Sequence, residues 1–120
     1  MNIYYQNIMD HFHNPECYGK LNDFTNSCEL KNLSCGDQIS VYLKIENGLL
    51  QDISFEGDGC AISQAAASMF LSEIVGKTTQ EILELDKQFI LDLMEMHLSP
   101  VRLKCALLCM EAVKKAILDQ

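Results

Sequence analysis

The sequence predicts an α+β fold in which a small antiparallel sheet of about three strands packs against helices. The first observation is strict alternation of apolar and polar residues around Val41 and Leu43, which is typical of a half-buried strand. The second is Asn47-Gly48, a strong signal for a tight hairpin between antiparallel strands. The third is a change after Gly59 to segments with helical spacing. Because the helical segments follow the strands instead of alternating with them, a parallel α/β sheet is not expected.

The first half of the chain is expected to form one helix followed by strands. Apolar residues between positions 2 and 12 recur at helical spacing, and Asn14-Pro15 should end that helix. Residues 24–31 are ambiguous and are interpreted as a short edge strand. A strand over 39–45 follows, and the return strand after the hairpin should place Gln51, Ile53 and Phe55 on one face.

The second half of the chain reads as helices. Residues 61–75 favour a helix that ends at Gly76, and Thr78 or Thr79 can cap a short helix after it. Asp86 can cap a further helix with Phe89, Ile90, Leu93 and Met94 inward. Ser99-Pro100 is a good start for the last helix. Its expected buried stripe is Val101, Cys105, Leu108, Ala112 and Ala116.

Composition and charge restrict the class of function. The chain has 120 residues, which suits one domain over 1–120 with its own core. Its formal net charge is −8 and it has no dense Lys/Arg run, so a nucleic-acid partner is not expected. We see no signal peptide and no apolar run of about 18 residues, so we expect no membrane span and a cytoplasmic protein. Thiols stay reduced there, so the six cysteines are not expected to form a disulfide framework.

The cysteines point to a metal site. Cys35 and Asp37 flank Gly36 in a turn before the first confident strand. Cys60 follows Gly57-Asp58-Gly59 and opens a helix, where the helix dipole favours a thiolate. Cys105 lies near the start of the last helix. Three thiols and one carboxylate form a soft donor set that suits zinc or an iron–sulfur cluster.

Several neighbouring residues leave alternatives open. Cys109 lies four residues after Cys105 on the same helix face, and its apolar surroundings favour a core position, but composition does not decide between the two. Arg102 and Lys104 would favour the thiolate form of Cys105. His11, His13 and His97 are other possible ligands, with a surface position the commoner reading for His97. Structural or incidental roles are expected for Cys17 and Cys28.

Taken together, these segments resemble the NifU N-terminal domain family, the iron–sulfur cluster assembly scaffolds of the Isc and Suf types. The resemblance runs over almost the whole chain. The residues that carry it are Asp10-His11-Phe12-His13-Asn14-Pro15 with Gly19, Cys35-Gly36-Asp37, Gly57-Asp58-Gly59-Cys60-Ala61-Ile62-Ser63, and Leu98-Ser99-Pro100-Val101-Arg102-Leu103-Lys104-Cys105.

The resemblance implies a scaffold that holds a transient [2Fe–2S] cluster, or zinc in its absence, on Cys35, Asp37, Cys60 and Cys105. It implies a cysteine desulfurase as the sulfur donor, with Cys105 as a possible sulfur acceptor, and apo iron–sulfur proteins as receivers of the cluster. Asp37 would be the labile ligand, because a carboxylate binds soft iron more weakly than a thiolate does. Such a protein is a carrier rather than a catalyst in the strict sense, although sulfurtransferase activity is compatible with the same site.

The sequence mixes features of the two types. Lys104 stands where Isc-type members carry histidine and Suf-type members lysine, yet the segment between Cys60 and Cys105 is too compact for the usual Suf-type insertion. The alternatives are therefore a zinc-bound sulfurtransferase of the SufU type and, from another class, a structural zinc domain used for interactions. Residues 98–102 differ at two of five positions from the Isc-type segment Leu-Pro-Pro-Val-Lys, which counts against an Hsp70-type chaperone partner. Cys17 stands where the family usually has asparagine.

Overall fold

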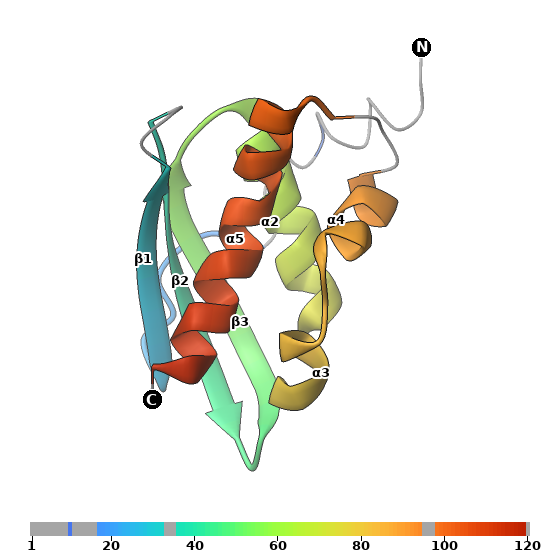
Figure 1. Ribbon diagram of the computed structural model, residues 1–120. Helices are drawn as coiled ribbons and strands as arrows, with labels where there is room; N and C mark the ends of the chain where they lie inside the picture. Colours follow the sequence, from blue (N-terminus) through green and yellow to red (C-terminus); the bar gives the residue numbers. More distant parts are fainter. Residues whose placement is uncertain (1–9, 11–16, 33–35, 95–97, 120) are drawn as a thin grey trace.

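The computed structural model describes residues 10, 17–32, 36–94 and 98–119 (Figure 1). A three-stranded antiparallel sheet has the order β1-β2-β3, with β1 at Asn26–Asn32, β2 at Asp37–Glu46 and β3 at Leu49–Asp58. Four helices follow: α2 at Ala61–Ile74, α3 at Thr79–Leu83, α4 at Lys87–Met94 and α5 at Pro100–Leu118. The predicted α+β fold is confirmed. The helix predicted over 2–12 and its stop at Asn14-Pro15 lie outside the described residues, Asp10 apart.

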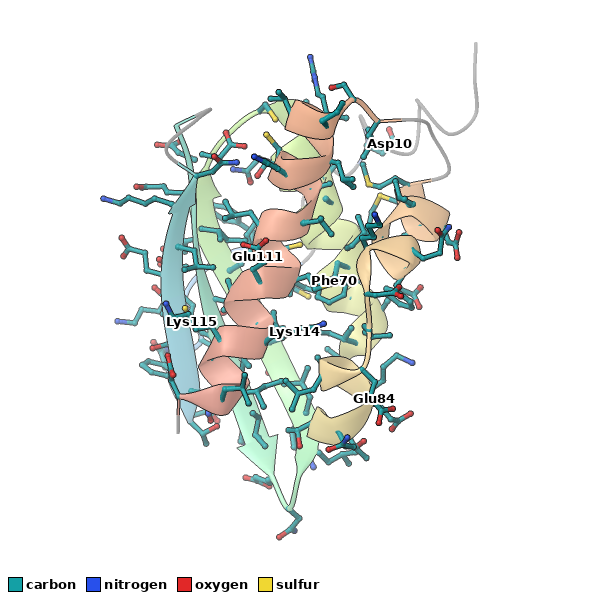
Figure 2. The ribbon with its side chains drawn as sticks, viewed as in Figure 1. Asp10, Phe70, Glu84, Glu111, Lys114 and Lys115 are labelled. Atoms are coloured by element: carbon teal, nitrogen blue, oxygen red, sulfur yellow. The ribbon has the colours of Figure 1, made fainter. Side chains whose placement is uncertain are left out.

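The helices form a layer on one face of the sheet (Figure 1). Helix α5 contacts β1 and β2, α2 contacts β3, and α2 and α5 pack against each other. The core lies between these layers and includes Val41, Leu43, Phe55, Phe70, Leu71, Ile74 and Val113, each at most 1% exposed. Helices α3 and α4 cover the far side of α2 and α5 (Figure 1). Phe70 of α2 packs edge-on against Phe89 of α4, and Lys114 of α5 donates a hydrogen bond to the Leu85 carbonyl (Figure 2).

The local signals for turns and helix starts agree with the structure. Asn47 and Gly48 both have positive φ, as a two-residue hairpin turn requires. Thr78 caps α3 through a reciprocal capping box with Glu81, and Ser99 caps α5 with Pro100 as its first residue. The ambiguous segment before the first confident strand is indeed an edge strand, β1, paired with β2.

On the return strand and on the last helix, one residue each does not lie on the predicted face. Gln51 is exposed, although Ile53 is buried, because the register shifts at Lys44 and Ile45 and makes Gln51 the extra residue of a β-bulge. The bulge resets the alternation, so Leu50 takes the core position instead. Val101 is 60% exposed because the first turn of α5 lies past the ends of the strands (Figure 1).

Residues 17–19 pair with the outer edge of β3. The Phe55 amide donates to the Cys17 carbonyl at 2.9 Å, and the Gly19 amide donates to the Phe55 carbonyl at 2.8 Å. Cys17 itself has a φ of 63°, in the left-handed region that asparagine adopts more readily than most other residues. This backbone geometry gives a physical reason for asparagine to be the usual residue at this position in the family that the sequence resembles.

Candidate metal centre

The candidate site forms where three elements meet at one end of the sheet. Asp37 is the first residue of β2, Cys60 is the N-cap of α2, and Cys105 lies in the second turn of α5. One ligand atom from each of these residues lies within 4.8 Å of the other two. The fold therefore brings together groups that are separated by 23 and 45 positions in the sequence.

Asp37 is a buried carboxylate, with only 3% of the residue exposed. Its Oδ1 accepts a hydrogen bond from the Cys60 amide at 3.2 Å, and its Oδ2 lies 3.8 Å from the Cys60 sulfur. A buried carboxylate needs compensation by hydrogen bonds or by a cation. One oxygen thus has a backbone donor, and the other points toward the thiol group that would share a metal ion with it.

Cys60 occupies the N-terminus of α2. Its sulfur accepts a hydrogen bond from the Ser63 amide at 3.4 Å, which is the usual geometry of an N-cap side chain. The helix N-terminus and this backbone donor thus both face the Cys60 sulfur, the atom that would bind a metal ion. Cys60 is half-buried, whereas Asp37 and Cys105 are buried.

Two glycines leave the space that this arrangement occupies. A Cβ at Gly59 would lie 2.9 Å from Cγ and Oδ1 of Asp37 and 3.2 Å from the Ser63 hydroxyl oxygen. A Cβ at Gly57 would lie 2.4 Å from the Gln38 carbonyl oxygen in the neighbouring strand. Gly57 is therefore required by strand pairing, whereas Gly59 is required by the position of the Asp37 carboxylate.

The geometry separates Cys105 from Cys109. Both thiols are buried, but within the described part of the chain only Cys105 groups with Asp37 and Cys60. The Cys109 sulfur instead donates to the Ala106 carbonyl at 3.5 Å, inside the hydrophobic core. Burial raises the pKa of the Cys109 thiol to about 12, so it stays protonated at neutral pH. Cys109 is thus a core residue, as its apolar context indicated.

The donor set fits a soft metal ion. Zinc binds thiolate sulfur at about 2.3 Å and carboxylate oxygen at about 2.1 Å, so a tetrahedral site separates these two donors by about 3.6 Å. The observed separation of the Asp37 oxygen and the Cys60 sulfur is 3.8 Å. Two sulfurs and one oxygen leave one position of a tetrahedral shell for a further ligand.

The other residues singled out in the sequence are distributed as follows. Cys35, His11, His13 and His97 lie outside the described residues. Lys104 is exposed on α5 and lines a groove of about 360 Å³ with Lys31, Asn32, Leu108 and Glu111; Figure 2 labels Glu111 on the same helix. Cys28 is half-buried on β1, and desolvation raises the pKa of its thiol. The influence of Lys104 on the Cys105 thiolate stays a prediction.

Two hydrogen bonds at the site were not predicted from the sequence. The Cys60 amide donates to the Asp37 carboxylate, and the Gln64 side chain donates to the Gly57 carbonyl at 3.1 Å. The first contact has a sequence signal, because a helix N-terminus offers free amide groups to any nearby anion. The second contact has no such signal, since it depends on how α2 packs against β3.

Comparison with known proteins agrees with this fold. The sequence model of the protein family described as the NifU-like N terminal domain matches residues 3–120. The chain is 35% identical to the iron–sulfur cluster assembly scaffold protein IscU of Thermotoga maritima, covering 96% of this chain and 92% of the relative. It is also 35% identical to the zinc-dependent sulfurtransferase SufU of Bacillus subtilis, covering 96% and 89%.

Solved structures give the same result. A SUF-system protein of Fervidobacterium islandicum, a proposed iron–sulfur cluster assembly scaffold, superposes with a TM-score of 0.80 at 31% identity over 98% of this chain and 96% of that one. The N-terminal part of a NifU-like protein of Brucella abortus superposes with a TM-score of 0.76 at 26% identity, over 96% and 92%.

Proposed function

This chain belongs to the NifU-like N-terminal domain family, and we propose that it is an iron–sulfur cluster assembly scaffold. In this role it accepts sulfur from a cysteine desulfurase, builds a transient [2Fe–2S] cluster and transfers it to apo-proteins. The observation that carries the proposal is the convergence of Asp37, Cys60 and Cys105, whose ligand atoms lie within 4.8 Å of one another. The same functional name is carried by the Thermotoga maritima relative.

Each residue of the site has a distinct task in this proposal. Cys60 and Cys105 provide thiolates from two different helices, and Cys35, two positions before Asp37 in the sequence, is proposed as the third sulfur donor. Asp37 provides the weakest bond to the cargo, because a carboxylate is a harder ligand than a thiolate. A scaffold must release what it holds, so one weak ligand within a sulfur-rich shell suits this task.

Sulfur enters by exchange between two cysteines. A persulfide on the desulfurase gives its outer sulfur to a scaffold thiolate, a new S–S bond forms as the old one breaks, and the desulfurase cysteine leaves as a thiolate. We assign acceptance to Cys105, with Lys104 favouring its thiolate. Cys105 is 3% exposed and Cys60 is half-buried, so transfer to Cys105 requires the site to open toward the donor.

A zinc-bound sulfurtransferase is the second candidate, and one relative supports it. The Bacillus subtilis protein with that function is as similar in sequence as the Thermotoga maritima scaffold. Lys104 also matches the Suf-type pattern. In this version zinc occupies the same donors, and the persulfide sulfur is passed on without cluster assembly. A structural zinc domain has less support, because this chain has an extensive hydrophobic core of apolar side chains between the sheet and the helices.

The remaining parts of the proposal concern context. We propose that residues 1–120 act as one domain, that the protein works in the cytoplasm, and that its partners are the desulfurase and apo acceptor proteins. In the described part of the chain, no helix is long and apolar enough to cross a membrane.

The test is reconstitution under anaerobic conditions with iron, cysteine and a cysteine desulfurase. A scaffold should develop the visible absorption of a [2Fe–2S] cluster, and Cys60→Ala and Cys105→Ala should each abolish it. Cys28→Ala is the matched control, because Cys28 lies on β1 outside the group of site residues. Zinc binding with sulfur transfer and no cluster would favour the second candidate. Equal absorption in the parent and both site variants would refute the proposed site.

A further inference from the structure

Gln64 is a polar residue next to the site, and it is not one of the proposed ligands. It lies in the first turn of α2 and is half-buried. Its side-chain nitrogen Nε2 donates a hydrogen bond to the Gly57 carbonyl oxygen at 3.1 Å, and its backbone amide donates to the Cys60 carbonyl at 3.1 Å. One residue thus contacts both the end of β3 and the N-cap of α2.

The Gly57 carbonyl is a fixed anchor for this contact. Gly57 pairs with Ile39 of β2, and the absence of a side chain lets the Gln38 carbonyl approach to within 2.4 Å of the place a Cβ would take. The strand end therefore cannot shift away from β2 without breaking the ladder. Because Asp37 begins β2, any group tied to Gly57 is also tied to the frame that carries the Asp37 carboxylate.

The segment between these two anchors carries Cys60. Gly59 alone connects Asp58, the last residue of β3, to the N-cap, and it has no side chain to restrict its own movement. The Gln64 side chain spans this connection from the helix back to the strand. Without that hydrogen bond, the first turn of α2 would be held to the end of β3 by fewer contacts, and the Cys60 sulfur could move relative to Asp37.

We propose that Gln64 is a positioning residue, which fixes Cys60 against Asp37 and thereby sets how tightly the site holds its metal and how fast it gives it up. The inference rests on the proposed function, because it assumes that Cys60 and Asp37 are ligands. Groups that orient metal ligands from outside the shell typically change metal affinity by about 10- to 100-fold when removed.

The experiment uses the full chain and cobalt(II), whose visible bands report the donor atoms and the geometry around the ion. Gln64→Met keeps the length of the side chain and removes the donor. We expect cobalt(II) to bind about tenfold more weakly, to dissociate faster into a chelator, and to show a changed thiolate-to-cobalt absorption. The metal-free variant should unfold at nearly the parent's urea concentration.

Gln88→Met is the matched control. Gln88 is an exposed helix glutamine that donates to Asp92 at 2.8 Å on α4, so its replacement has the same chemistry at a distant place. Gln64→Asn is a second variant in case Gln64→Met does not fold; its shorter side chain also loses the reach to Gly57, and it should show the same loss.

The outcomes are distinct. Parent-like affinity, dissociation rate and absorption in both Gln64 variants would overturn the positioning role, as would an equal loss in Gln88→Met. A parent protein without any thiolate-to-cobalt absorption would refute the metal site itself, and this proposal with it.

Discussion

Gly59→Ala is the substitution that most directly tests the geometry of the site. The added Cβ would lie 2.9 Å from Cγ and Oδ1 of Asp37, whereas ordinary van der Waals contacts begin at 3.4 Å. The φ angle of Gly59 lies outside the left-handed region, so the backbone itself accepts alanine. The whole effect must therefore come from the contact with Asp37 and, at 3.2 Å, with the hydroxyl of Ser63.

The magnitude follows from these distances. Relief of the contact requires the carboxylate to move by about 0.5 Å, which would stretch its hydrogen bond with the Cys60 amide from 3.2 Å to beyond useful length. Loss of a hydrogen bond to a charged group together with overpacking lowers the free energy of unfolding by about 2 kcal/mol. Displacement of a ligand oxygen by that amount should weaken zinc binding at least as much as loss of an outer-shell contact, about 10- to 100-fold.

Urea denaturation in the absence and presence of zinc measures both effects. A tenfold weaker affinity reduces the stabilisation by excess zinc by about 1.4 kcal/mol. Gly48→Ala is the control: Gly48 has a φ of 73° in the hairpin at the other end of the sheet, with no described atom within 4 Å of the added Cβ. Strain in the left-handed region lowers its stability by about 1 kcal/mol and leaves zinc affinity unchanged. Parent-like zinc affinity in Gly59→Ala, or an equal loss in Gly48→Ala, would refute the reasoning.

Four further substitutions test separate parts of the structure. Gly57→Ala should lower the free energy of unfolding by about 3 kcal/mol, measured by urea denaturation, because its Cβ meets the Gln38 carbonyl at 2.4 Å; a parent-like midpoint would contradict the close strand contact. Cys17→Asn should raise stability by about 0.5 kcal/mol in the same assay, since asparagine tolerates a φ of 63° better, and a decrease would argue against backbone strain. Asp37→Ala should slow loss of cluster colour in air by removing the labile ligand; faster loss would make that role wrong. The free energy of unfolding of the parent should fall as the pH rises from about 9 toward 12, because the Cys109 thiol ionises near its ordinary pKa in the unfolded chain but stays protonated in the fold. Cys109→Ala should flatten this decline in urea denaturation. An unchanged pH profile in the variant would exclude the thiol as its cause.

The parts of the fold that could be predicted from sequence depend on local chemistry. Asn47-Gly48 defines its hairpin because few other pairs accept two positive φ angles, and Ser99-Pro100 defines a helix start because both residues suit free amide groups. The exposed Gln51 could not be predicted, since a bulge depends on the partner strand and not on the residue itself.

The site shows the same division. Glycines and a helix start marked Cys60 as a candidate, and the turn around Gly36 marked Asp37. Residue types alone left the choice between Cys105 and Cys109 open, because the two share one helix face. The family resemblance favoured Cys105, and the structure places Cys105 beside Asp37 and Cys60. The left-handed backbone at Cys17 accounts for asparagine as the usual residue at this position, and nothing in the structure explains the cysteine that replaces it here.

The placement of Asp37, Cys60 and Cys105 on three separate elements has a consequence for the life cycle of the protein. In small zinc modules the ion replaces a hydrophobic core, so removing the ion unfolds the chain. Here the sheet and the helices are joined by a large hydrophobic core that includes Val41, Phe55 and Phe70, so burial of apolar side chains holds the elements together. We therefore expect that release of a cluster from the proposed site leaves the fold intact, so that the same molecule can bind another cluster without refolding.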